Sequence, residues 1–312
     1  MNKLNGSSMH PYRTGPFRQL LVRIASGLLL SCVASVVSAQ SPPEQTKTFL
    51  WKIASPTATV HLLGSVHVAS PDLYPLDPRI EFAFQGAPTL VLETPMDPAA
   101  QVQAGQKLAA AGTYPAGDSI DLHLDRDVLN LLQERLKKSG PSFGMVRSFR
   151  PWFMAVILAL AEMQRLGYRP ELGIDLYFAE KAKSRKRVLA LETPDEQAAL
   201  FSGMPEAVQE AMLKDVLTKL DELGALMKKT QLLWRMGDAK AIDELMLAPM
   251  RKDYPDVFQR LFVDRNRRMA AAIEGYLKAT GDFFVVVGGG HLTGPDGILD
   301  LLRTKGYMPV QQ

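Results

Sequence analysis

Four short apolar runs, spread over the chain and separated by helical segments, each lead to a histidine or a glutamate. The runs have the length and composition of buried strands and cover residues 58–63, 89–92, 187–191 and 283–287. Strands that alternate with helices predict an α/β fold. Ligands and catalytic groups gather at the carboxyl ends of strands in such sheets. We therefore expect the functional residues just beyond these four runs.

The residues that follow the runs form a mirror-like series. Histidine occurs only five times in 312 residues, yet two occurrences close the similar motifs Gly64-Ser65-Val66-His67 and Gly288-Gly289-Gly290-His291. Between them, Leu-x-Leu-Glu-Thr-Pro occurs twice and ends the other two runs on Glu93 and Glu192. The order His, Glu, Glu, His predicts two similar halves, each contributing one imidazole and one carboxylate.

The pattern of the whole chain predicts a mixed β-sheet flanked by helices, with pseudo-twofold halves and a helical insertion at about 205–280. Residues 49–53 and 58–63 are separated by Ser55-Pro56, which predicts an opening hairpin. Residues 205–277 contain no convincing strand and are broken near 237–238 and 253–255. Further helices are expected at 79–85, 127–138, 151–166, 174–183 and 298–303, and an edge strand at 306–310.

The amino-terminal segment resembles a signal peptide. Residues 1–39 carry four basic and no acidic residues, then a short apolar stretch and the small-residue site Val37-Ser38-Ala39. The stretch is shorter than the roughly 20 apolar residues of a membrane anchor. Lipoprotein processing at Cys32 fits less well, because Leu30 suits that signal poorly. We predict cleavage after residue 39, a linker at 40–46, a domain at 47–312, and a periplasmic or secreted protein without a transmembrane span.

Loss of the signal peptide changes both charge and redox chemistry. Removing four of the 36 basic residues leaves 32 against 33 acidic residues, so nucleic acid is not an expected partner. Cys32 is the only cysteine. The mature chain thus lacks the thiols that cysteine nucleophiles, zinc–thiolate sites and Fe–S clusters need.

Two imidazoles and two carboxylates at strand ends predict a divalent-metal site. His67, His291 and one of Glu93 or Glu192 would bind Mn, Co or Zn, and the other carboxylate would be the general base. A charged cluster at 264–268 includes Arg265 and Asn266, which could orient the substrate near the ion. In the alternative interpretation, each histidine only ends a strand and each glutamate only caps a helix.

Other motifs carry weaker predictions. Gly140-Pro141-Ser142-Phe143-Gly144 matches a nucleophile elbow, which would make Ser142 a serine-hydrolase nucleophile. An elbow must follow a strand, however, and this motif follows the charged end of a helix. His61 is expected to be a packed strand residue and His123 a solvated one.

Together these motifs resemble the TraB/GumN family, which also contains the animal Tiki proteases. The resemblance covers about residues 47–310 and rests on the following residues: Gly64-Ser65-Val66-His67, Glu93, Gly173-Ile174-Asp175, Leu191-Glu192-Thr193 with Gln197, Trp234 with Gly237-Asp238, Arg265-Asn266, and Gly288-Gly289-Gly290-His291-Leu292 with Gly294 and Gly297. It implies the fold of erythromycin-esterase-like and ChaN-like proteins. It also implies metal-dependent protease chemistry at His67, His291 and Glu93, with Glu192 as a second carboxylate and Arg265-Asn266 as a polar pair.

The prediction that results is an exported metal-dependent hydrolase, peptidase-like in its chemistry, that acts on a peptide or a small-molecule substrate. The alternative is a periplasmic protein of the same fold that binds haem or a peptide without turning it over.

Overall fold

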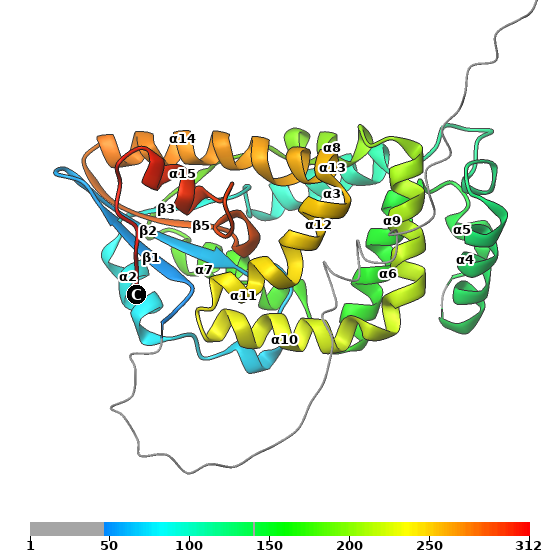
Figure 1. Cartoon of the computed structure of the whole chain (residues 1–312), viewed down its shortest axis with the longest axis horizontal. Coiled ribbons are helices and arrows are strands. Elements are labelled where there is room, and N and C mark those ends of the chain that lie inside the picture. Colours follow the sequence, from blue (N-terminus) through cyan, green and yellow to red (C-terminus); the bar gives the residue numbers. More distant parts are fainter. Residues whose placement is uncertain (1–46, 140) are drawn as a thin grey trace, which may run out of the picture.

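The predicted strand runs form one mixed sheet. The computed structural model describes residues 47–139 and 141–312, and its sheet has the order β4-β3-β5-β2-β1-β6 (Figure 1). The strands are β1 (Leu50–Ala54), β2 (Ala58–Ser65), β3 (Thr89–Leu92), β4 (Arg187–Ala190), β5 (Gly281–Gly288) and β6 (Val310–Gln311). β4, β3, β5 and β2 are parallel, whereas β1 is antiparallel to both β2 and β6. This arrangement confirms the predicted α/β fold and the opening hairpin.

Helices cover both faces of the sheet and extend beyond one end of it (Figure 1). They are α2 (Pro78–Gly86), α3 (Pro98–Ala111), α4 (Arg126–Ser139), α5 (Phe143–Val146), α6 (Pro151–Arg165), α7 (Ile174–Ala182), α8 (Pro194–Ser202), α9 (Glu206–Lys219), α10 (Leu223–Arg235), α11 (Ala239–Ile242), α12 (Ala248–Asp253), α13 (Pro255–Phe258), α14 (Asp264–Lys278) and α15 (Ile298–Thr304). Two π-helical turns, Asp243–Leu247 and Gln259–Val263, lead into α12 and α14.

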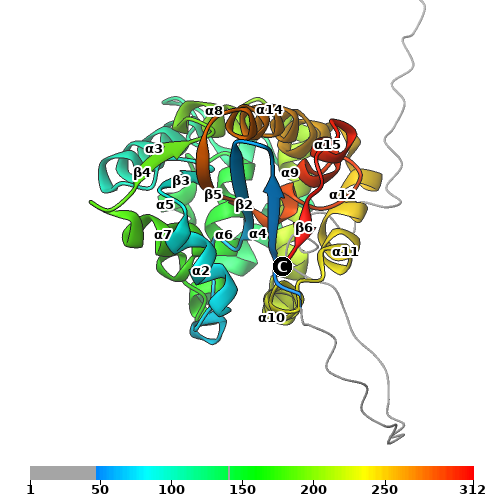
Figure 2. The same cartoon turned by 90° about the vertical axis from the view of Figure 1, so that its left-hand side faces the viewer.

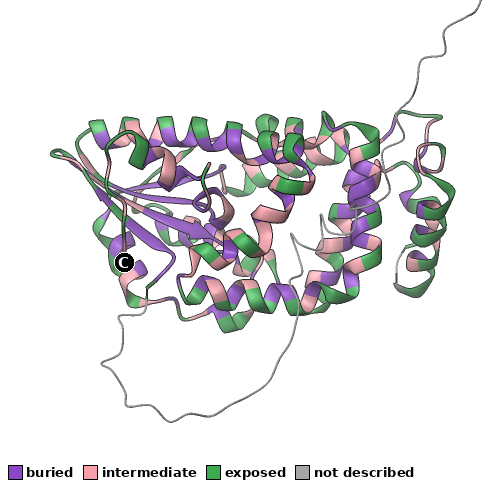
Figure 3. Cartoon of the chain, in the orientation of Figure 1, coloured by how far each residue is buried: buried purple, intermediate pink, exposed green. Residues whose placement is uncertain are grey.

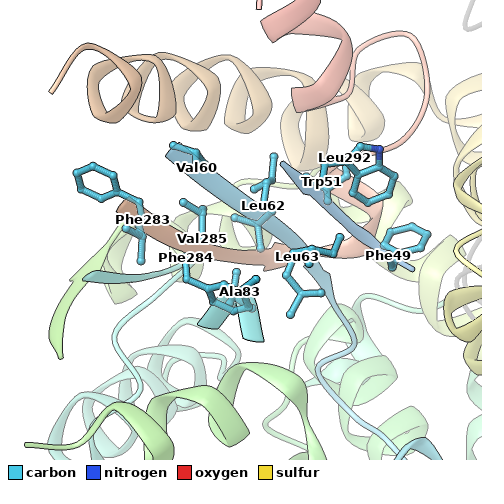
Figure 4. Close-up of a cluster of buried hydrophobic side chains, with 14 of the residues drawn as sticks. Phe49, Trp51, Val60, Leu62, Leu63, Ala83, Phe283, Phe284, Val285 and Leu292 are labelled. Carbon is cyan, nitrogen blue, oxygen red and sulfur yellow. The ribbon is translucent and has the colours of Figure 1, made fainter. Parts of the chain in front are cut away.

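The main core lies on both sides of the central strands. Phe283 of β5 stacks on Tyr276 of α14, with 4.9 Å between ring centroids. The next residue, Phe284, points to the opposite face, where it meets Phe84 of α2 and Phe178 of α7. α14 and α15 therefore cover one face, and α2 and α7 cover the other (Figure 2). Figure 4 shows the side chains of β1, β2 and β5 in this core, together with Ala83 from α2.

A second, helical part lies beyond the carboxyl ends of the parallel strands (Figure 1). Its core comes from α4, α6, α9 and α10, and the outer faces of these helices are exposed (Figure 3). Residues 205–277 are helical without a strand, and the chain breaks at Gly237-Asp238 and Tyr254-Pro255, as predicted. α14 belongs to this segment but packs on the sheet. The insertion and the pseudo-twofold halves stay predictions.

The carboxyl-terminal edge strand lies later than predicted. Gly306 has a φ of +88° in a turn that follows α15, and the Tyr307 N–H donates to the Leu302 carbonyl. Residues 306–309 consequently lie outside the strand, and pairing with β1 begins at Val310.

The predicted signal peptide, the linker at 40–46 and Cys32 lie outside the described residues. Within residues 47–139 and 141–312, no helix is both long and apolar enough to cross a bilayer.

Candidate active site

The four predicted residues all follow strands of the parallel part of the sheet. His67 comes two residues after β2, Glu93 directly after β3, Glu192 two residues after β4, and His291 three residues after β5. The backbone pairing continues past the strand ends, because the Glu192 N–H donates to the Glu93 carbonyl at 2.9 Å. Parallel pairing thus brings the four residues to one edge of the sheet, next to the helical part.

Glu93 lies between the two imidazoles. Its Oε2 is 4.0 Å from His67 Nε2, and its Oε1 is 3.9 Å from His291 Nε2. The Gly288 N–H donates to Oε2 at 2.8 Å, and Gln197 Nε2 donates to Oε1 at 3.3 Å. The Glu93 side chain is 5% exposed. The carboxylate is therefore fixed from several sides at the point where the histidines meet.

Each imidazole is held by a partner on its other nitrogen. His67 Nδ1 lies 2.8 Å from Asp175 Oδ2, and His291 Nδ1 lies 2.6 Å from Asn266 Oδ1. Since each Nδ1–H donates to its partner, both rings turn Nε2 toward Glu93. Metal-binding histidines commonly donate their other ring N–H to an oxygen in this way, which fixes the orientation of the ring. The rings differ in access, because 54% of the His67 side chain is exposed but only 5% of the His291 side chain.

Glu192 lies behind this centre, against Arg265. The guanidinium donates to both Glu192 oxygens, from Nε at 2.8 Å and from Nη2 at 2.7 Å. Nη2 also donates to Glu93 Oε1, and Nη1 donates to the Leu261 carbonyl at 3.1 Å. Arg265 and the two glutamates are all buried. The Arg265 guanidinium thus binds both carboxylates of the repeated Leu-x-Leu-Glu-Thr-Pro motif.

Burial and charge shift the pKa values of the three central groups. The negative charge of Asp175 is the main cause that raises the pKa of His67 to about 9. Burial lowers the pKa of His291 well below its usual value. Burial alone would raise the pKa of Glu93, but the surrounding imidazoles, Arg265 and the Gly288 N–H outweigh it and lower that pKa to about 2. Glu93 is therefore ionised at neutral pH.

Glycines provide the close backbone approach that the centre needs. A Cβ on Gly288 would lie 2.9 Å from His67 Nε2, 3.3 Å from Glu93 Oε2 and 3.4 Å from His291 Cδ2. A Cβ on Gly64 would lie 2.4 Å from the Phe49 ring, and one on Gly173 would lie 2.4 Å from the His67 carbonyl oxygen. Trp234 donates its indole N–H to the Gly64 carbonyl at 2.6 Å. The glycines before each histidine were expected to keep space open over the metal, and the short distances at Gly288 fit that expectation.

The imidazole nitrogens of His67 and His291 and the carboxylate of Glu93 are suitable ligands for a divalent ion. They lie farther apart, however, than the ligands of a bound ion. Zn²⁺ binds imidazole nitrogen and carboxylate oxygen at about 2.0–2.2 Å, so neighbouring tetrahedral ligands lie about 3.4 Å apart. The distances of 4.0 and 3.9 Å from Glu93 to the imidazoles are wider by about half an ångström. Throughout the described part of the chain, no group of three or more His, Cys, Asp or Glu side chains is already arranged to hold a metal ion.

The remaining predicted residues lie in other surroundings. Ser142 is exposed and follows helix α4, with no strand before it, and Gly140 of the same motif is outside the described residues. His61 is a half-buried residue of β2. His123, expected to be solvated, instead lies 2.7 Å from Asp118 and stacks on Tyr114.

Asp175 is the site residue whose function the sequence analysis missed. It belongs to the quoted motif Gly173-Ile174-Asp175, yet nothing in that motif indicates a histidine partner 108 positions away. The available signal was an acidic residue at the start of an apolar helix. That pattern is common and usually reflects a favourable interaction with the helix dipole.

Comparison with known proteins identifies the family of the chain. Residues 49–311 match the TraB/PrgY/gumN family. The uncharacterized protein YbaP of Escherichia coli (strain K12) is 27% identical over 249 residues, covering 78% of this chain and 87% of YbaP. An uncharacterized protein of Treponema pallidum (strain Nichols) is 24% identical over 297 residues, covering 88% of this chain and 87% of that protein.

A more distant relative has a named activity. The metalloprotease TIKI2 of Danio rerio is 23% identical over a region that covers 83% of this chain and 60% of TIKI2. No solved structure matches the chain. The family match spans nearly all of the described residues and includes both Gly-x-x-His motifs, so the chain belongs to the TraB/PrgY/gumN family.

Proposed function

We propose that this protein is a metal-dependent hydrolase that acts on peptide bonds. The observation that carries the proposal is the common direction of three donors, His67 Nε2, His291 Nε2 and the Glu93 carboxylate, over the bare backbone of Gly288. The distant similarity to TIKI2, a metalloprotease by name, supports hydrolysis of a peptide.

In this proposal His67, His291 and Glu93 would hold the ion, which would be Mn, Co or Zn. A bound divalent cation would supply an activated water and polarise the carbonyl of the substrate. The exposed side of His67 leaves an approach for a substrate, whereas the burial of His291 keeps water from its side of the centre.

The contacts favour positioning functions for the other three predicted residues. Both Glu192 oxygens accept hydrogen bonds from Arg265, so Glu93 is the carboxylate that we assign to the reacting centre. Arg265 is buried between the two glutamates and holds them in place. Asn266 accepts from His291 Nδ1 and donates its amide to the Asp296 carbonyl at 2.8 Å, so it orients His291.

Metal binding is the first test. We expect the purified protein, incubated with Mn, Co or Zn and desalted, to retain the ion, and His67→Ala and His291→Ala each to lose it. His61→Ala is the matched control, because it removes an imidazole from β2 outside the centre. Elemental analysis gives the metal content. Unchanged content in both site variants would remove these histidines from the proposal.

Hydrolysis is the second test. We expect cleavage of a peptide library in the presence of the bound ion, loss of cleavage with a chelator, and recovery when the ion is added back. Mass spectrometry of the products identifies the bonds that break. A visible absorption band on addition of haem, without cleavage under any of the three metals, would instead favour the ligand-binding alternative.

A further inference from the structure

The environment of His67 is built by the amino-terminal end of α7. The Ile174 N–H donates to the Val66 carbonyl at 3.1 Å, and Gly173 lies directly against the His67 backbone. Asp175 is the second residue of the helix, and its side chain is 3% exposed. The end of α7 is therefore docked on the segment that carries the histidine.

Both oxygens of Asp175 face that segment and not their own helix. Oδ2 is bound to His67 Nδ1 at 2.8 Å, and Oδ1 accepts from Ser65 Oγ at 3.0 Å. The residue that caps α7 is Gly173, which has no side chain to do so. A carboxylate that served only the helix would accept from the free N–H groups of the first turn. Both oxygens of the Asp175 carboxylate are therefore bound to side chains at or just after the end of β2, Ser65 and His67.

The other imidazole has a partner of different charge. His291 Nδ1 donates to the neutral amide oxygen of Asn266, which is itself held by the Asp296 carbonyl. The two histidines of the Gly-x-x-His motifs thus differ in the residue that accepts from Nδ1. This residue is an anionic carboxylate for His67 and a neutral amide for His291. An anionic partner makes an imidazole a stronger donor to a cation than a neutral partner does.

We propose that Asp175 is a positioning residue, which fixes the ring of His67 with Nε2 toward Glu93 and makes His67 the stronger of the two imidazole donors. Ser65 completes the arrangement by holding the second oxygen of Asp175. The part of this proposal that concerns the ion depends on the proposed function. The part that concerns the orientation of the ring does not.

The test uses Asp175→Ala, which removes the acceptor, and Asp175→Asn, which keeps an acceptor but removes its charge. Asp195→Asn is the matched control, because Asp195 is the second residue of α8 just as Asp175 is the second residue of α7. Asp195 is exposed and paired with Lys107, away from the histidines. The control therefore measures what an acid at this helical position contributes without a histidine partner.

The first measurement is NMR of the metal-free protein labelled with ¹⁵N-histidine. A strongly hydrogen-bonded Nδ1–H of His67 gives a downfield proton signal, which is assigned by its absence in His67→Ala. We expect this signal to persist in Asp195→Asn, to move upfield in Asp175→Asn and to disappear in Asp175→Ala. If the signal is unchanged in Asp175→Ala, the positioning proposal is wrong, whether or not the protein binds a metal.

The second measurement is a calorimetric titration with Mn²⁺, Co²⁺ and Zn²⁺. Loss of the residue that accepts a hydrogen bond from a metal-binding histidine typically costs about 10–100-fold in metal affinity. We expect a loss in that range for Asp175→Ala, a smaller loss for Asp175→Asn and none for Asp195→Asn. Equal affinities of Asp175→Ala and the parent protein would refute the donor-strength part. If the parent protein binds none of the three ions, the proposed function and this part both fail, and the NMR result alone decides the positioning of the ring.

Discussion

Replacing Gly288 with alanine is expected to abolish metal binding and hydrolysis while leaving the chain folded. The added Cβ would lie 2.9 Å from His67 Nε2 and 3.3 Å from Glu93 Oε2, in the space between the proposed ligands. His67 could relieve this contact only by turning Nε2 away or by leaving Asp175. Misplacement of a reacting group by about 1 Å costs about 100-fold in rate, and we expect a loss of at least that size.

The backbone conformation of Gly288 allows the effect of the added Cβ to be measured without backbone strain. Its φ of −50° and ψ of 133° are accessible to alanine, so the expected damage comes from the Cβ and not from strain. Gly275→Ala is the control, because a Cβ at that position of α14 meets no atom within 4 Å. Metal content, peptide cleavage and thermal unfolding are measured for both variants. A Gly288→Ala protein that binds the ion as the parent does would place the ion somewhere other than between His67 and Glu93.

The strands were predictable because their signal is local. Each apolar run is short and bounded by turn residues, and β2, β3 and β5 are buried along most of their length. β4, expected to be a buried strand, instead lies at the edge of the sheet and is mostly exposed. Helix α3 was not predicted, and its lack of buried residues explains why. A helix that buries no residue does not need an apolar stripe, and the sequence of α3, rich in alanine and glutamine, has none. A helix of this kind forms without the periodicity on which the prediction relied.

The residues of the centre were predictable for a topological reason, but their partners were not. Parallel strands bring their carboxyl ends to one edge, so four strand-end residues could be grouped from sequence alone. The bond between Arg265 and Glu93 spans 172 positions, and the bond between Asp175 and His67 spans 108. Partner choice over such separations depends on how α7 and α14 pack on the sheet.

The cluster at 264–268 illustrates this limit. As a sequence it is one run of charged and polar residues, equally suited to an exposed basic face. In the folded chain, α14 turns Arg265 and Asn266 inward, where both are buried. The side chains of Arg267 and Arg268 are 62% and 53% exposed. The helical period separates these two pairs, but only the position of the sheet decides which pair faces inward.

Replacing Arg265 with alanine is expected to have the largest effect on stability. Arg268 Nη2 lies 3.6 Å from Glu192 Oε1. Glu93 and Glu192 are both buried, however, and both bind the Arg265 guanidinium. Without it, two carboxylates remain buried with much less compensating charge. Removal of one partner of a buried ion pair costs about 3–5 kcal/mol, a large fraction of the 5–15 kcal/mol that stabilises a typical domain. The free energy of unfolding of the metal-free protein, measured in urea at neutral pH, should fall by about that amount.

The control for this prediction lies two residues further along the same helix. Arg267 is mostly exposed and lies 3.9 Å from Asp264, so Arg267→Ala should change the free energy of unfolding by no more than about 1 kcal/mol. Glu192→Gln in the Arg265→Ala background removes one of the two charges and should recover part of the loss. Equal destabilisation by Arg265→Ala and Arg267→Ala would mean that the buried network does not stabilise the fold.

The pH dependence of the stability lost in Arg265→Ala distinguishes an effect of charge from an effect of side-chain packing. In the folded parent the pKa of Glu93 is lowered from 4.5 to about 2, so its ionised form contributes stability above about pH 4.5 that is lost as the pH falls toward 2. Arg265 is one source of that shift, so Arg265→Ala should lack part of this contribution. The difference in unfolding free energy between the parent and Arg265→Ala should accordingly be largest at neutral pH and shrink below pH 4.5. A difference that stays constant over this range would assign the effect to lost packing of the arginine side chain, because packing does not depend on the ionisation of Glu93.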